Sequence, residues 1–277
     1  MRFWKLSAIG NEFVLVHRDD DPQIDWPNLA INVCNRRTGV GSDGLLVMKG
    51  HQLRMFNPDG SEDFCGNGLR CAAVHGYSQG WLERQDSISH FNRMVRTWIT
   101  GKDEAMVELP PATFDPVQVP VLSEAGVFVE EWHVAGSQLT LSALSTGSTH
   151  VVLIGEEPTD EAFFTISGAL EHDPRFPDRT STMWATALGP RDLKLRPFER
   201  GAGETRGCGT GSAAVAVVHS RLTGATGQIN VHNTGGIVAV HLEDWQGPIR
   251  LSSKVKTHFS GVLDRSMIPR TLPTKSV

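Results

Sequence analysis

The feature that most constrains this chain is a short cysteine and glycine pattern that occurs twice. Cys65 lies in a Cys-Gly-Asn-Gly run and Cys208 lies in a Cys-Gly-Thr-Gly run. In both copies a glycine stands five residues before the cysteine, and an alanine-rich stretch follows the run. One copy could arise by chance among 28 glycines, but two copies about half a chain apart indicate a duplicated structural unit.

Hydrophobic patterning predicts many short strands and few helices. β-branched runs bounded by Gly, Pro or Asp are typical of strands. They cover residues 13–16, 45–48, 106–109, 127–129, 150–154, 229–231 and 237–240. Helices are expected after Cys65, after Cys208 and from about Thr159, where Asp160 and Glu161 favour a first turn. This mixture indicates an α+β fold class.

Composition and charge exclude several classes of protein. Hydrophobic residues make up 39% and charged residues 21% of 277 positions, which is typical of globular chains. With a net charge of −5 and scattered basic residues, we expect neither nucleic-acid binding nor a membrane span. The start of the chain lacks a signal-peptide core, so the cytoplasm is the expected location. The four cysteines contain no Cys-x-x-Cys pair, so we expect no metal site.

A cysteine at the start of a helix has distinctive chemistry. A helix N-terminus presents unpaired N–H groups and a partial positive charge, which favour thiolate over thiol. The same N–H groups can bind a carboxylate. Two such helix starts facing one amino acid would place Cys65 and Cys208 on opposite sides of its Cα.

That arrangement suits inversion at Cα without a cofactor. One thiolate removes the proton from one face, and the opposite thiol delivers a proton to the other face. The bound carboxylate takes up the developing negative charge. The plainer interpretation, two buried structural cysteines at glycine-rich turns, stays open at this point.

At these residues the sequence resembles the diaminopimelate epimerase family over nearly its whole length. The second signature, residues 199–211, is almost identical to the family's pattern. The other segments that carry the resemblance are residues 10–13 (Gly-Asn-Glu-Phe), 39–45, 57–71 and the glycine pair 235–236. The resemblance implies two pseudo-symmetric halves, each with a mixed or antiparallel sheet wrapped around a central helix. We expect the halves to cover residues 1–112, joined by 262–277, and 113–261, with a linker near 109–116.

The resemblance also implies the site and the assembly. The active site would lie in the cleft between the halves of a homodimer, with a small-molecule amino acid as substrate and no pyridoxal phosphate or metal. Cys65 and Cys208 would be the two acid/base groups. His150 and Glu199 would tune the two thiols. Substrate-binding positions would be Asn11, Asn57, Gly66, Asn67, Ser148, Ser181, Glu199, Arg200, Gly209 and Thr210.

Two departures from the family pattern concern the far end of the substrate. Ser148 and Ser181 stand where the family has asparagines that hold the distal end of diaminopimelate. Serine offers one donor where an asparagine amide offers two, so the loss of both changes recognition. Trp184 stands where the family has a smaller aromatic residue, and the sequence leaves open whether its ring reaches this end of the pocket.

Three hypotheses remain open from sequence. The first is a two-thiol epimerase or racemase acting on diaminopimelate or, alternatively, on histidine, lysine or glutamate. The second is a non-racemising isomerase or an amino-acid-binding relative. The third is a thiol-redox or metal-binding protein, in which Cys65 and Cys208 would pair or share a metal.

Overall fold

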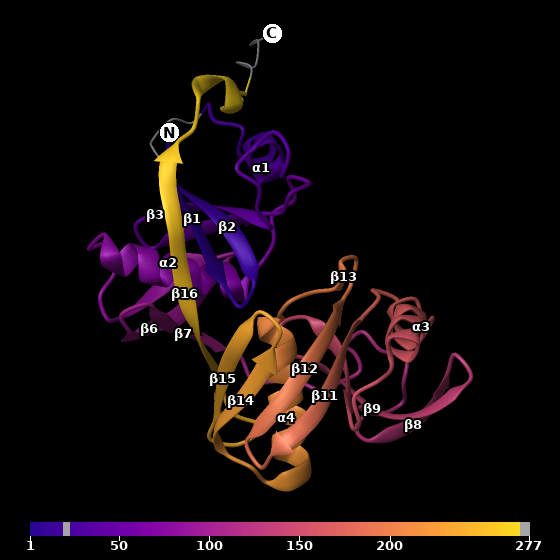
Figure 1. Ribbon diagram of the computed structural model, residues 1–277. Coiled ribbons are helices and arrows are strands. Elements are labelled where there is room, and N and C mark those ends of the chain that lie inside the picture. The colour runs from indigo at the N-terminus through magenta and orange to yellow at the C-terminus, as the bar shows by residue number, and fades with distance from the viewer. Residues whose placement is uncertain (19–22, 272–277) are drawn as a thin grey trace. The chain divides into compact units, whose positions relative to one another are not determined.

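The computed structural model describes residues 1–18 and 23–271, and it divides into two compact units (Figure 1). Unit 1 comprises Met1–Val107 with Ser253–Val277, and unit 2 comprises Glu108–Ser252. The sequence led us to expect boundaries at 112 and 262, and residues 272–277 of the expected C-terminal segment lie outside the described residues. Strands with interleaved helices make this an α+β fold, as the sequence predicts.

Unit 1 contains two helices and a mixed sheet. Its elements are β1 (Arg2–Ala8), β2 (Asn11–His17), α1 (Trp26–Cys34), β3 (Gly44–Lys49), β4 (Gln52–Phe56), α2 (Gly66–Ser78), β5 (Gln85–His90), β6 (Arg93–Gly101), most of β7 (Glu104–Leu109), the C-terminal part of β16 (Ile249–Val262) and the 3₁₀ turn Arg265–Met267. The C-terminal part of β16 pairs with β1.

Unit 2 has the same kinds of element in a similar order. They are β8 (Glu130–Val134), β9 (Ser137–Ser145), β10 (Thr149–Ile154), α3 (Asp160–Glu171), β11 (Ser181–Gly189), β12 (Asp192–Glu199), β13 (Gly203–Glu204), α4 (Gly209–Thr223), β14 (Gly227–Asn233), β15 (Gly236–Leu242) and the N-terminal part of β16. That part of β16 pairs with β15.

The strand pairing repeats from one unit to the other. In unit 1, β1–β2 is antiparallel, β2–β3 parallel, β3–β4 antiparallel, β4–β5 parallel and β5–β6 antiparallel. In unit 2, β9–β10, β10–β11, β11–β12, β12–β14 and β14–β15 follow the same alternation. The parallel pairs enclose a helix each time: α1 or α3 in the first crossover, α2 or α4 in the second. The duplicated pattern in the sequence is therefore a duplicated topology.

Each unit wraps its sheet around one buried helix (Figure 1). The helix α2 contacts strands β1 to β6, and α4 contacts β9 to β12, β14 and β15. Every residue from Asn67 to Gly76 in α2 is buried. In α4, residues 211–220 are all buried, with small side chains that let the surrounding strands approach closely. A helix apolar on all sides is stable only when it is enclosed in this way.

One predicted strand is wrong. Residues 127–129 are not a strand, because Val129 has a positive φ of 55° that turns the chain. Strand β8 begins only at Glu130. Val127 is buried and its carbonyl accepts a hydrogen bond from Ala143, so its apolar side chain reflects core packing of a loop.

The helices expected after both cysteines and near Thr159 are present. Thr159 is the N-cap of α3, and its side chain accepts the N–H of Ala162. None of the helices within residues 1–18 and 23–271 is long and apolar enough to cross a membrane.

The loop of residues 39–43 caps the C-terminal end of α1, and position 39 of this loop has room only for glycine. The N–H groups of Gly39, Gly41 and Ser42 bond the carbonyls of Asn35, Val33 and Cys34 respectively. A Cβ on Gly39 would lie 2.2 Å from the Asn32 carbonyl oxygen and 2.6 Å from that of Val33. These atoms are backbone, so they cannot yield as a side chain would.

We therefore predict that Gly39→Ala lowers the free energy of unfolding by about 1–3 kcal/mol, the cost of overpacking. The change is measured from the urea midpoint at constant slope. Gly155→Ala is the matched control, because a Cβ there meets nothing within 4 Å. Equal midpoints for the two variants would contradict the prediction.

Candidate active site

Cys65 is the N-cap residue of α2. Its backbone is extended, with φ −139° and ψ 108°, and its Sγ accepts the N–H of Gly68 at 3.3 Å. The Leu69 N–H bonds the Cys65 carbonyl at 2.9 Å. Helical geometry gives the N–H groups of Gly66 and Asn67 no partner inside the helix, so they are available to an anion.

Cys208 is the N-cap of α4 in the same conformation. Its φ is −123° and its ψ is 117°, and its Sγ accepts the Gly211 N–H at 3.3 Å. A Cβ on Gly211 would lie 2.3 Å from the Met183 sulfur and 3.2 Å from the Cys208 Cβ. The glycine three residues after the cysteine therefore lets the sulfur and the neighbouring strand approach the helix together.

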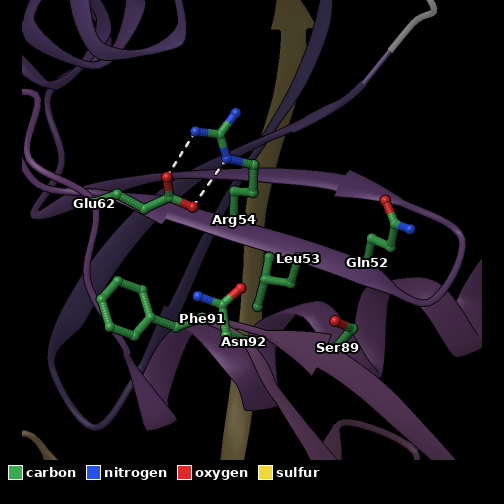
Figure 2. Close-up of a pocket in the computed structure, with 7 residues that line it drawn as sticks. All are labelled: Gln52, Leu53, Arg54, Glu62, Ser89, Phe91 and Asn92. Carbon is green, nitrogen blue, oxygen red and sulfur yellow. Dashed lines mark hydrogen bonds and ion pairs between the residues drawn. The ribbon is translucent and has the colours of Figure 1, made fainter.

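An arginine–glutamate pair braces the loop before each cysteine. Arg54 donates two hydrogen bonds to Glu62, at 2.9 and 2.6 Å, as Figure 2 shows. Arg196 donates in the same two-pronged way to Glu204, at 2.7 and 3.2 Å. The arginine and the glutamate are eight residues apart in both pairs. Each glutamate also forms an antiparallel backbone bridge to a phenylalanine, Glu62 to Phe56 and Glu204 to Phe198. The duplication therefore includes the support of the cysteine loops.

The cavity in Figure 2 lies beside the first of these braces in unit 1. It has a volume of about 350 Å³ and is lined by Gln52, Leu53, Arg54, Glu62, Ser89, Phe91 and Asn92. None of the residues predicted for substrate binding is among this set.

The surroundings of Cys208 raise the pKa of its thiol. Burial raises the pKa of the Cys208 thiol well above its usual value, and the negative charge and hydrogen bond of Glu199 raise it further. Hydrogen bonds from Thr210 and from the Gly211 N–H act in the opposite direction. Cys208 is therefore a thiol near neutral pH when no substrate is present.

Two of the predicted residues of unit 1, Asn11 and Asn67, are joined by a hydrogen bond. Asn67 donates through its amide to the Asn11 side-chain oxygen and accepts from the guanidinium of Arg70, which also bonds the Ser253 hydroxyl at 2.7 Å. This chain fixes the orientation of the Asn67 amide. Asn57 lies just after β4, where its amide donates to Ser61 at 3.0 Å.

The predicted residues of unit 2 lie around the start of β11. Ser181 accepts the backbone N–H of Arg200 at 3.0 Å, so its hydroxyl already bonds within the protein. His150 faces Ser181 in the parallel β10–β11 register and is 1% exposed. Burial, helped by the charge of Arg200, lowers the pKa of His150 to about 3. Its two ring nitrogens have no hydrogen-bond partner within the described part of the chain.

The structure places the Trp184 side chain against α3. Its indole N–H donates to Ser167 of α3 at 2.9 Å, and its ring packs against the core beneath that helix. Side chains alternate along a strand, so Trp184 and Ser181 point to opposite faces of β11. Met183, which does share a face with Ser181, is the residue that meets α4.

The remaining predicted residues of unit 2 lie in bends and turns, at the end of β12 or in the first turn of α4. The Thr146 hydroxyl donates to the Thr210 carbonyl at 3.0 Å, and Ser148 is half-buried in the turn that follows. The Thr205 hydroxyl donates to Glu199, and Arg200 donates to the carbonyl of Asp178 at 2.6 Å. Within residues 1–18 and 23–271, no group of three or more His, Cys, Asp or Glu side chains is arranged to hold a metal ion.

Sequence reasoning missed two residues that contact the cysteines. The Cys65 N–H donates to Nε2 of His90 at 3.0 Å, and the Cys208 N–H donates to Oδ1 of Asn233 at 3.2 Å. Each partner stands 25 residues after its cysteine, at the end of the next main strand. The equal spacing was the available signal, but the two residue types differ.

This chain resembles known proteins over most of its length. The family model described as diaminopimelate epimerase matches residues 3–93 and 142–256. The diaminopimelate epimerase of Desulforudis audaxviator is 34% identical over 274 residues, which cover 94% of this chain and 98% of that protein. 

Two solved structures share the fold at low identity. A probable proline racemase from Agrobacterium radiobacter has a TM-score of 0.66 and 12% identity, covering 95% of this chain and 93% of that one. A PhzF-family phenazine biosynthesis protein from Bacillus anthracis has a TM-score of 0.65 and 16% identity, covering 95% and 99%. The family match and the full-length relative together show that this chain belongs to the diaminopimelate epimerase family and is an isomerase, an amino-acid epimerase.

Proposed function

We propose that the protein inverts a Cα centre by a two-base mechanism in which Cys65 and Cys208 act on opposite faces of one amino acid. The observation that carries the proposal is the equivalence of the two cysteines. Each is the N-cap of the buried helix of its unit, with its sulfur bonded to a backbone N–H. A helix N-terminus is where a thiolate and a bound carboxylate are both stabilised.

The steps follow from this chemistry. The N–H groups of Gly66 and Asn67, and those of Gly209 and Thr210, bind the substrate carboxylate. A thiolate at one cysteine takes the Cα proton, and the carboxylate accepts the negative charge as an enolate forms. The thiol of the other cysteine gives its proton to the opposite face of Cα. One sulfur gains the proton that the other loses, so no cofactor takes part.

The substrate in this proposal is diaminopimelate, converted from the LL to the meso form in lysine and cell-wall biosynthesis. Support comes from the names of the curated relatives, which match nearly the whole chain. Asn11, Asn57, Glu199 and Arg200 would bind the substrate beyond its reacting centre, and His150 would act as a neutral hydrogen-bond partner. As part of the same proposal, the enzyme is a homodimer.

A second candidate is a racemase of histidine, lysine or glutamate with the same mechanism. The observation that favours it is Ser181, whose short hydroxyl bonds the Arg200 N–H. With Ser148 and Ser181 in place of amides, the protein has fewer donors for a distal carboxylate.

We predict that Cys65→Ser and Cys208→Ser each lower the rate of racemisation by about 10²–10⁴-fold, the usual contribution of a general acid or base. Circular dichroism and Cα hydrogen–deuterium exchange by NMR measure the loss. Cys71→Ala is the control, because Cys71 is fully buried on α2 and burial raises the pKa of its thiol. Retention of the parent rate by either serine variant would disprove the two-base assignment.

We predict that Glu199→Gln shifts the alkylation of Cys208 to lower pH. Removing the negative charge beside the thiol, with only a neutral amide acceptor left, lowers the pKa of Cys208, so the reactive thiolate forms at lower pH. Iodoacetamide labelling followed by peptide mass spectrometry gives the midpoint for Cys208. Glu157→Gln, at an exposed surface pair with Lys194, serves as control. An unchanged midpoint in Glu199→Gln would remove Glu199 from the tuning of Cys208.

We predict that diaminopimelate exchanges its Cα proton in deuterated water faster than histidine, lysine or glutamate does. NMR of each amino acid with the same amount of enzyme measures the rates, with Cys208→Ser as the blank. Exchange of one of the other three amino acids without exchange of diaminopimelate would favour the second candidate and leave the mechanism standing.

A further inference from the structure

Each cysteine is held at its backbone by a side chain from a strand. His90 is the last residue of β5 and Asn233 is the last residue of β14. These strands are equivalent in the two units, since each follows the buried helix and pairs in parallel with the strand before it. His90 is 1% exposed and Asn233 is 8% exposed, so water does not compete freely for either contact.

The hydrogen bonds of His90 define its protonation. Nε2 accepts the Cys65 N–H, so it carries no proton, and Nδ1 donates to the Leu53 carbonyl at 3.2 Å. The ring is therefore neutral with its proton on Nδ1. Phe64 stacks on the ring at 5.1 Å between centroids and an interplanar angle of 27°, which fixes its plane.

Asn233 is held as firmly by different partners. Its Oδ1 accepts the Cys208 N–H, and its Nδ2 donates to the Ser212 hydroxyl and to the Val231 carbonyl, both at 3.1 Å. The Ser212 hydroxyl in turn donates to the Cys208 carbonyl at 2.7 Å. Asn233 is therefore linked to the N–H of Cys208 directly and to its carbonyl through Ser212.

We infer that His90 and Asn233 are positioning residues that fix the peptide plane before Cys65 and Cys208 and so aim each sulfur. The inference rests on the proposed two-thiol function. The N–H of an N-cap residue lies outside the helix ladder, so without an outside acceptor the extended φ of the cysteine is not fixed. If the cysteine leaves that conformation, its sulfur loses the third N–H of the helix and the stabilisation of its thiolate.

The two acceptors differ in one property. His90 can be protonated and Asn233 cannot. Low pH therefore disrupts the hydrogen bond from the Cys65 N–H to His90 but not the one from the Cys208 N–H to Asn233. Burial lowers the pKa of His90, whereas the hydrogen bond to the Leu53 carbonyl and the carboxylates of Glu62 and Asp63 act to raise it. The guanidinium of Arg93 lies 5.6 Å from the Phe64 ring centroid and adds a positive charge near the stacked rings. Because the net effect is a lowered pKa, the His90 ring stays neutral at pH values where an exposed histidine would already be protonated.

The test compares His90→Leu with His90→Asn. Leucine removes the acceptor, whereas asparagine restores the acceptor that unit 2 uses at the equivalent position. Iodoacetamide labelling resolved by peptide mass spectrometry gives the pH midpoint of each cysteine separately. Steady-state exchange of diaminopimelate gives kcat and KM, and urea unfolding shows whether each variant is folded.

We predict that His90→Leu raises the labelling midpoint of Cys65 and leaves that of Cys208 unchanged. Its kcat should fall by about 100-fold, the cost of a misplaced reacting group, with little change in KM. His90→Asn should return both the Cys65 labelling midpoint and kcat most of the way to the parent values. His172→Leu, which removes an exposed histidine bonded to its own helix, should change neither quantity.

Three results would overturn the inference. They are an unchanged Cys65 midpoint in His90→Leu, a shift of both cysteines together, or a failure of His90→Asn to improve on leucine. Should His90→Leu not fold, Asn233→Leu supplies the same test in unit 2, where only the Cys208 midpoint should move. Because labelling needs no substrate, it decides the positioning role even if no amino acid undergoes exchange, which would instead refute the proposed function.

Discussion

The hydrogen bond from a helix N–H to the sulfur of the preceding cysteine is the interaction on which the rest of this structure depends. Gly68 donates it to Cys65 and Gly211 donates it to Cys208, at 3.3 Å in both units. In both units the donor N–H belongs to a buried residue, and that residue has no Cβ, which would otherwise meet Leu46 at Gly68 and Met183 at Gly211. The enclosing sheets supply the burial and the glycines supply the space.

The two cysteines share the same backbone setting, since each is the N-cap of the buried helix of its unit. The side chains around them differ. Asn57 and Glu199 both follow the phenylalanine of a brace, but only Glu199 brings a charge to its thiol. His90 and Asn233 both accept a cysteine N–H, but only His90 titrates. A repeated backbone tolerates such changes as long as each position still supplies the hydrogen bond that the backbone needs.

Local signals predicted the parts of the fold that depend on local physics. Thr159 before two acidic residues marked the start of α3, and the glycine-rich runs marked the starts of α2 and α4. The helix α1 (Trp26–Cys34) was missed, although Asp25 caps it and Pro27 stands in its first turn. At nine residues it is short, and the carbonyls of its last two residues accept hydrogen bonds from the loop that contains Gly41 and Ser42.

Prediction failed where a side chain's role depends on what packs against it. Val127 and Val129 have strand-like composition, but the positive φ of Val129 ends the extended run. The sequence next to Trp184 does not reveal which face of β11 the ring occupies, because that face depends on strand register and on Ser167 of α3. Partners of this kind lie far apart in sequence, so no local pattern encodes them.

The sequence by itself determined the duplicated pattern, the α+β class, the helix starts at both cysteines and the resemblance that led to the family. These follow from spacing and composition, which act over a few residues or over one repeat. Only the tertiary structure decided that burial and Glu199 raise the pKa of Cys208, and that His90 and Asn233 accept the N–H groups of the two cysteines. The pKa of a thiol and the direction of its sulfur are set by burial and by groups that folding brings within a few ångströms.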